Sequence, residues 1–176
     1  MTTSMITGCS TGIGLTTAVH LATRGHTVYA SMRDEASSHA LLAAADEAGA
    51  EVAVLSLDVD DPESIKDGVD HVLASAGGLD VLVNNAGVGD LSTVEETTDA
   101  DLRQMFQTNV FGPIALIRAV LPTMRSAGSG TIVNVSSVSA RIVSALSGPY
   151  AATKYAIEAI TQAVAIEGAA YGIRSF

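Results

Sequence analysis

Residues Thr7–Gly14 read T-G-C-S-T-G-I-G, and this stretch decides the fold. It follows a short apolar run at Ser4–Thr7 and opens a stretch of helical period at Gly12–Arg24. In such a place glycines allow a tight turn, and the N–H groups at a helix N-terminus can hold a pyrophosphate. The Gly-Lys-Ser/Thr of a nucleoside-triphosphate loop is missing, because Ile13 and Gly14 stand there. The loop therefore predicts a dinucleotide site, with a glycine-rich turn that binds nothing as the alternative.

Short β-branched runs alternate with longer alanine-rich stretches along the whole chain. This alternation is typical of βαβ units, so we expect an α/β fold with a doubly wound parallel sheet of Rossmann type in three α/β/α layers. The expected strands are Ser4–Thr7, Thr27–Met32, Val52–Asp58, Val81–Asn84 and Thr131–Ser136. The expected helices are Gly12–Arg24, Ala36–Ala48, Pro62–Ala76, Asp99–Arg125 and Pro149–Tyr171. Pro113 is placed to bend the fourth helix.

The composition bounds the class of protein. The 176 residues are 48% hydrophobic with one cysteine, which fits a single domain over residues 1–176. A dinucleotide site and any catalytic residues are therefore expected in the same domain. No apolar run approaches the roughly 20 residues that span a bilayer, and no secretory signal opens the chain, so a soluble cytoplasmic protein is expected. Nine basic and nineteen acidic side chains give a net charge of -10, which argues against nucleic acid or an anionic membrane as partner.

The end of the second expected strand indicates which dinucleotide binds. An acidic residue there would bond the adenosine ribose 2′-hydroxyl, whereas an arginine would accept a 2′-phosphate. Met32 occupies the usual acidic position, and Arg33 follows it. A guanidinium pairs well with phosphate, and a methionine offers ribose hydroxyls nothing. The sequence therefore favours NADP(H), with NAD(H) held by Asp34 as the less favoured alternative.

Polar side chains gather at the carboxyl ends of the later strands, where ligands of open α/β folds bind. Asn84–Gly87 closes the fourth expected strand, and Ser136 and Ser137 end the fifth. Tyr150 and Lys154 are four residues apart at the start of the last helix and share one face. A nearby ammonium favours the phenolate form of a tyrosine, which makes this pair suited to acid–base chemistry. An exposed helical pair without a function is the alternative for these two residues alone.

Other polar residues give weaker signals. The four histidines show no ligand spacing and no cluster of cysteines or carboxylates joins them, so no metal site is expected. The acidic stretch Asp58–Glu63 precedes a helix and is interpreted as cap and dipole partners. Cys9 stands near a helix N-terminus, a place that can lower a thiol pKa, but it is expected to pack as a small residue.

Together these segments resemble the compact form of the short-chain dehydrogenase/reductase family, which carries T-G-x-x-x-G-x-G and Y-x-x-x-K, and the resemblance covers essentially the whole chain. The cofactor-binding residues that it implies are Gly8, Ser10, Thr11, Gly12, Ile13, Gly14, Arg33, Asp58, Val59, Asn85, Ala86, Gly87, Tyr150 and Lys154. The catalytic residues that it implies are Asn109, Ser137, Tyr150 and Lys154. Ser137 is preferred over Ser136 because it lies thirteen residues before Tyr150, the separation typical of the family.

The resemblance implies hydride transfer between a nicotinamide and a small carbonyl or alcohol substrate. Tyr150 would donate or accept the proton at the substrate oxygen, and Ser137 would hydrogen-bond that oxygen. Lys154 would bind the nicotinamide ribose and lower the tyrosine pKa, and Asn109 would keep a water beside Lys154 as a proton relay. Members of the family commonly pair through their fourth and fifth helices, so a homo-oligomer is possible, although the alanines that would permit such pairing could equally pack internally.

The chain ends where similar family members continue. Gly172–Phe176 looks like the entry to a sixth strand, but the sequence stops there. We therefore expect a sheet without its usual last strands and an unpaired outer edge on the strand at Thr131–Ser136. Two functions follow: an NADP(H)-dependent oxidoreductase that interconverts a carbonyl and a secondary alcohol, or a catalytically inactive fragment that binds the dinucleotide.

Overall fold

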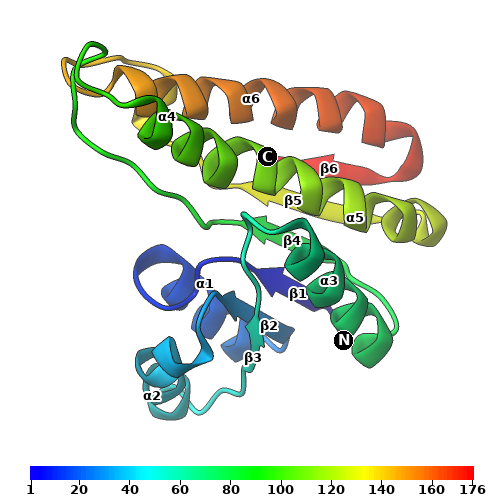
Figure 1. The fold of residues 1–176 in the computed structure, drawn as a ribbon. Coiled ribbons are helices and arrows are strands. Elements are labelled where there is room, and N and C mark those ends of the chain that lie inside the picture. The colour runs from blue at the N-terminus through cyan, green and yellow to red at the C-terminus, as the bar shows by residue number, and fades with distance from the viewer.

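The computed structural model describes residues 1–176 and contains one six-stranded sheet with helices on both faces (Figure 1). The strand order is β3-β2-β1-β4-β5-β6 with every neighbouring pair parallel, which is the order of the doubly wound dinucleotide fold. The predicted α/β class is confirmed. The strands are β1 (Thr3–Ile6), β2 (Thr27–Met32), β3 (Ala53–Ser56), β4 (Val81–Asn84), β5 (Gly130–Asn134) and β6 (Ile173–Ser175).

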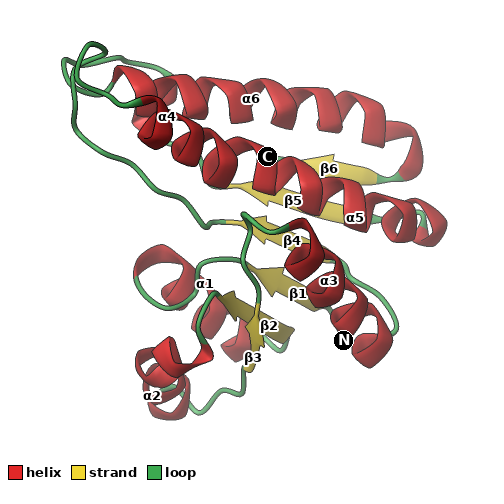
Figure 2. Ribbon diagram, viewed as in Figure 1, coloured by secondary structure: helices red, strands yellow, loops and turns green.

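Six α-helices connect and follow the strands (Figure 2). They are α1 (Gly12–Thr23), α2 (His39–Glu47), α3 (Pro62–Ala76), α4 (Asp99–Phe106), α5 (Gly112–Ala127) and α6 (Gly148–Gly168). Three 3₁₀ turns, η1 (Glu35–Ser38), η3 (Val138–Ala140) and η4 (Ala169–Tyr171), and one π-helical turn, η2 (Gln107–Phe111), complete the chain. None of these helices combines the length and the apolar character that crossing a bilayer requires.

Two hydrophobic clusters, one on each face of the sheet, hold the layers together. Neighbouring residues of a strand point to opposite faces. Met5 and Leu82 accordingly belong to the larger cluster, with residues of α3, α5 and α6. The next residues along, Ile6 and Val83, belong to the smaller cluster, with residues of α1 and α2. The strands are apolar on both faces because helices cover both of them.

The expectation of a sheet that ends at five strands is wrong. After η4, Gly172 takes a φ of +69°, a left-handed conformation that favours glycine, and turns the chain back along β5. The N–H of Phe176 then donates to the Ile132 carbonyl at 2.9 Å, and the Asn134 N–H donates to the Phe176 carbonyl at 2.8 Å. The outer edge of β5 is therefore paired rather than open.

The single long helix expected over Asp99–Arg125 is divided in the structure. Pro113 has no N–H, so it cannot donate to the carbonyl of Asn109 four residues earlier. The hydrogen-bonding register shifts to π-helical at this point, and the N–H of Gly112 bonds to the Gln107 carbonyl. Such turns often occur at functional sites, and this one contains Asn109, a predicted site residue.

The contribution of β6 to the core can be tested at Ile173, which is 2% exposed and belongs to the larger hydrophobic cluster. Ile173→Ala is expected to lower the free energy of unfolding by about 2–5 kcal/mol, because it removes buried methyl groups and leaves a cavity. Phe176→Ala is the control, since this side chain is 62% exposed; its effect should stay within about 0.5 kcal/mol. Urea unfolding measures both values, and equal effects would contradict the packing of β6 described above.

Candidate active site

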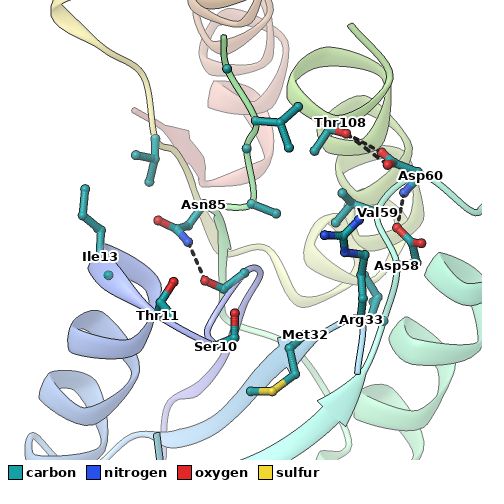
Figure 3. Close-up of a pocket in the computed structure, with 18 of the residues that line it drawn as sticks. Ser10, Thr11, Ile13, Met32, Arg33, Asp58, Val59, Asp60, Asn85 and Thr108 are labelled. Atoms are coloured by element: carbon teal, nitrogen blue, oxygen red, sulfur yellow. Dashed lines mark hydrogen bonds between the residues drawn. The ribbon is translucent and has the colours of Figure 1, made fainter. Parts of the chain in front are cut away.

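A cavity of about 530 Å³ opens at the carboxyl ends of the strands, and Figure 3 shows it in close-up. Among the predicted cofactor residues, all except Gly14 line it: Gly8, Ser10, Thr11, Gly12, Ile13, Arg33, Asp58, Val59, Asn85, Ala86, Gly87, Tyr150 and Lys154. The predicted catalytic residues Asn109 and Ser137 do not line this cavity. The glycine-rich loop and the Tyr150–Lys154 pair therefore line the same cavity.

The glycine-rich loop after β1 is held in place by the residues that follow β4. The Asn85 side-chain amide donates to the Thr7 carbonyl oxygen at 2.8 Å and to the Gly8 carbonyl oxygen at 3.1 Å, and Figure 3 shows the second of these bonds. The Thr7 hydroxyl in turn accepts the backbone N–H groups of Asn85 and Ala86 at 3.1 and 3.0 Å. The N-N-A-G segment thus clamps the loop, in addition to lining the cavity.

Gly14 lies behind the loop and permits its close approach to α1. A Cβ at this position would overlap the Gly8 carbonyl oxygen and would come within 2.5 Å of the Asn85 amide nitrogen. The carbonyl is backbone and cannot move aside without distorting the loop. Gly14 is therefore required by packing, and the structure places it outside the lining of the cavity.

The N-terminus of α1 is free to receive an anion. Thr11 at the N-cap makes no side-chain hydrogen bond to the helix, and the first turn contains no acidic residue. Ile13 in that turn is 65% exposed although it is apolar. The first N–H groups of a helix have no partner within the helix and carry the positive end of its dipole. A phosphate-bearing ligand in the cavity would accept hydrogen bonds from these N–H groups and would place negative charge at the positive end of the dipole.

The end of β2 presents a free arginine to the cavity. Met32 and Arg33 both line the hollow, and the exposed guanidinium of Arg33 forms no ion pair or hydrogen bond with another residue. Asp34 does not line it. Its carboxylate instead accepts the N–H of Ala36 at 2.9 Å and caps η1. The acidic group is thus occupied, while the basic group remains available for a ligand.

Tyr150 and Lys154 lie on the first turns of α6, with the Lys154 Nζ 5.6 Å from the centroid of the Tyr150 ring. Lys154 is 6% exposed and donates to the Val135 carbonyl at 2.9 Å. Burial lowers the pKa of Lys154 from its ordinary value. The chain therefore holds an ammonium away from water beside a phenol, with one protein acceptor.

Ser137 is the N-cap residue of η3, in the segment that follows β5. Its hydroxyl oxygen accepts the N–H of Ser139 at 3.1 Å. The hydroxyl proton has no protein acceptor, so it is free to be donated to a ligand.

The Asn109 side chain is fully engaged within the protein. Its Oδ1 accepts the N–H of Val88 at 2.8 Å, and its Nδ2 donates to the Val88 carbonyl at 2.7 Å and to the Thr153 hydroxyl at 3.1 Å. The Thr153 hydroxyl donates to the Tyr150 carbonyl at 2.7 Å. The amide thus joins the loop after β4 to α6, and contact with a water would fall to the Asn109 backbone carbonyl, from which Pro113 removes the helical donor.

Two polar residues of the cavity were not assigned to the site from the sequence. Asp60 was interpreted as a helix partner, but Asp61 is the residue that caps α3, by accepting the Glu63 N–H at 3.0 Å. Asp60 instead accepts the Thr108 hydroxyl at 2.8 and 3.0 Å (Figure 3). The only sequence feature that could have pointed to Thr108 is its place beside Asn109, and this place does not indicate that Asp60 is its partner.

Cys9 packs as the sequence predicted. Its side chain is fully buried and donates to the Ile6 carbonyl at 3.2 Å. Burial raises the pKa of the thiol to about 12, against the smaller lowering effect of its hydrogen bond at Ser31. The thiol is therefore protonated and unreactive at neutral pH.

Comparison with known proteins identifies the family. The family model described as short chain dehydrogenase matches residues 2–175, and the chain belongs to this family of oxidoreductases. The family resemblance predicted from the sequence is confirmed.

Three curated relatives illustrate the match. The chain is 34% identical over 163 residues to a 3-ketodihydrosphingosine reductase of Bacteroides thetaiotaomicron, covering 93% of this chain and 57% of that protein. It is 40% identical over 169 residues to retinol dehydrogenase 8 of Homo sapiens, covering 94% and 53%. It is 36% identical over 170 residues to a cyclopentanol dehydrogenase of Comamonas testosteroni, covering 97% and 68%. The chain thus spans little more than half the length of the first two.

Solved structures agree with this assignment. A short-chain dehydrogenase from Streptomyces avermitilis superposes with a TM-score of 0.91 at 40% identity, covering 98% of this chain and 62% of that one. A metagenomic short-chain oxidoreductase in complex with NADP superposes with a TM-score of 0.93 at 30% identity, covering 98% and 79%.

The buried ammonium gives a prediction about stability. Lys154→Met replaces the charge with an apolar side chain of similar length, so we expect the free energy of unfolding at pH 7 to stay equal or to rise. Since burial lowers the pKa of Lys154, the unfolded chain binds more protons than the folded chain at pH values between that lowered pKa and the ordinary lysine pKa of about 10.4. Stability of the wild type should therefore increase relative to the variant as the pH rises toward that value.

Urea unfolding of both proteins at neutral and at alkaline pH measures this difference. A large loss of stability in Lys154→Met at pH 7 would show instead that the ammonium stabilises the fold.

Proposed function

We propose that the protein is an NADP(H)-dependent oxidoreductase that interconverts a carbonyl and a secondary alcohol, with Tyr150 as the general acid and base. The observation that carries this proposal is the position of the Tyr150–Lys154 pair on the same cavity as the glycine-rich loop. A site that holds a dinucleotide at one end and a tyrosine beside a buried ammonium at the other suits proton transfer at a substrate oxygen.

The residues of the cavity fit a nicotinamide dinucleotide. The uncapped N-terminus of α1 would hold the pyrophosphate, Asp58 and Val59 would contact the adenine, and Lys154 would bind the nicotinamide ribose. When bound, the cofactor supplies or accepts the hydride.

The choice of NADP(H) is supported by the end of β2. A 2′-phosphate would meet the guanidinium of Arg33, which has no partner in the protein, whereas Asp34 is engaged in capping η1. A forked, charge-assisted contact of this kind adds both energy and selectivity. The metagenomic relative in complex with NADP is consistent with this choice.

Each proposed catalytic residue would have a separate role in the proton transfer. Tyr150 would give its proton to the substrate oxygen in reduction and take it back in oxidation. The neighbouring Lys154 ammonium would stabilise the negative charge that develops on the phenol oxygen as the proton leaves. Ser137 would donate its free hydroxyl proton to the same oxygen and hold it within reach of Tyr150. The backbone carbonyl of Asn109 would keep a water beside Lys154.

An apolar substrate is supported by the loops around Tyr150. The loop after β4 and the loop before α6 are joined by a hydrogen bond of 3.0 Å from the Ser92 N–H to the Leu146 carbonyl. Both carry large exposed apolar side chains: Leu91, Val94, Val138, Ile142, Val143 and Leu146. The relatives above are named for a sphingoid ketone, a retinoid alcohol and a cyclic alcohol. Apolar ketones are therefore the first substrates to test.

Selectivity for the cofactor is tested at Arg33. Arg33→Ala is expected to raise the Kd of NADPH about ten-fold or more, because a charge-assisted hydrogen bond to phosphate is lost. The Kd of NADH should not change. Fluorescence titration of the purified chain measures both constants, and Arg24→Ala, an exposed arginine at the end of α1, is the matched control. Equal weakening of both cofactors by Arg33→Ala would contradict the assignment.

Catalysis is tested at Tyr150. Tyr150→Phe is expected to lower kcat for NADPH-dependent reduction of an apolar ketone by about 10²–10⁴-fold, since the proton donor is removed. Binding of NADPH should persist. Tyr155→Phe, on an exposed tyrosine of the same helix, is the control. Turnover that survives in Tyr150→Phe would refute the role of this residue. Binding without turnover in the wild type, on any carbonyl, would favour the inactive dinucleotide-binding alternative.

A further inference from the structure

The π-helical turn η2 contacts both halves of the site through two consecutive side chains. Thr108 is 5% exposed and donates to the Asp60 carboxylate in the loop after β3. Asn109 is 2% exposed and binds the N–H and the carbonyl of Val88 in the loop after β4. One turn of backbone therefore links the loop on the adenine side to the loop on the nicotinamide side.

The contacts continue on both sides of this turn. On the adenine side, the Asp60 N–H donates to the Asp58 carboxylate at 3.0 Å (Figure 3). On the catalytic side, Asn109 donates to Thr153, whose hydroxyl donates to the Tyr150 carbonyl. The backbone of Tyr150 is thus connected to Asp58 through an unbroken set of hydrogen bonds and adjacent residues.

The contact between Asp60 and Thr108 is not part of the cap of α3. The N-cap of α3 is already supplied by Asp61. The Asp60 carboxylate also accepts the Gln104 side chain at 2.6 Å, and Gln104 donates to the Thr108 hydroxyl at 3.0 Å. Gln104 lies in α4, Thr108 in η2 and Asp60 in the loop after β3. Their hydrogen bonds therefore fix η2 against that loop.

We propose that Asp60 and Thr108 form a positioning pair that sets the place of Asn109, and through Asn109 the places of the Val88 loop and of Tyr150. This inference rests on the proposed function, because it assigns the pair a role in aligning that same site. Asp60 and Thr108 act through Asn109 and are therefore positioning residues. The pair would in this way fix the position of Tyr150 relative to the loop after β3, which is proposed to contact the adenine.

The first test is turnover of two Thr108 variants and one control variant. Thr108→Val keeps the shape but removes the hydroxyl, and it is expected to lower kcat about ten-fold or more, the effect of losing a hydrogen bond to a charged group. The Kd of NADPH should change less than about three-fold, because the lost contact is not to the cofactor. Thr108→Ser, which restores the hydroxyl, should recover most of kcat. Thr23→Val, on an exposed threonine whose hydroxyl bonds only within α1, is the control.

A double-mutant cycle decides whether the two residues act together. If Thr108 works through Asp60, the pair Asp60→Ala and Thr108→Val should reduce kcat no more than the larger single change does. Additive losses would overturn the proposal. So would a Thr108→Val protein with the kcat of the wild type.

A second measurement requires no turnover. Amide hydrogen exchange of the unliganded chain should speed up in Thr108→Val at residues 85–91 and at the first turn of α6, but not in α2, and Thr108→Ser should restore protection. Unchanged exchange at these segments would overturn the proposal. Absence of turnover in the wild type would refute the proposed function, whereas the exchange result decides the positioning pair independently.

Discussion

The Asn85 side-chain amide, which donates to the carbonyl oxygens of Thr7 and Gly8, is the contact on which the dinucleotide site depends. It joins the loop after β1 to the end of β4, two strands that are neighbours in the sheet. A loop rich in glycine would otherwise have many conformations available. With its carbonyl groups fixed from β4, the loop brings the uncapped N-terminus of α1 to the cavity in one orientation.

The end of the cavity at Tyr150 and Lys154 is held by polar contacts rather than by the hydrophobic core. Lys154 is buried with one protein acceptor, and burial lowers its pKa. A charge in such a place does little to stabilise a fold, which agrees with the role proposed for Lys154 beside Tyr150. The π-helical turn serves the same end, because Pro113 disrupts a helix at the point where Thr108 and Asn109 must reach different loops. Local departures from regular structure thus coincide with the proposed site.

Much of this site could be predicted from the sequence because the carboxyl ends of parallel strands meet at one edge. The glycine-rich loop, Arg33 and Asn85 were predicted from their places at strand ends, and Tyr150 from its spacing to Lys154 and from the family resemblance; all of them line the cavity. Gly172–Phe176 was recognised as the entry to a sixth strand but was expected to leave β5 unpaired, whereas three residues, Ile173–Ser175, are enough to pair with β5. The Asp60–Thr108 contact joins residues 48 positions apart, and neither residue type signals its partner. Gly14 fits the motif, but only the structure shows that it faces the Gly8 carbonyl rather than the cavity.

The charge of the whole chain makes the contacts at Arg33 and α1 more important. A net charge of -10 repels an anionic dinucleotide at long range, and Asp58 and Asp60 add negative charge to the cavity itself. Salt at physiological concentration screens exposed charges beyond about 8 Å, so the distant carboxylates matter less than the groups in contact with the ligand. Affinity for a dinucleotide must then come from the helix N-terminus and the guanidinium. The proposed preference for NADP(H) therefore rests on one unpaired arginine, placed to meet the single phosphate by which the two cofactors differ.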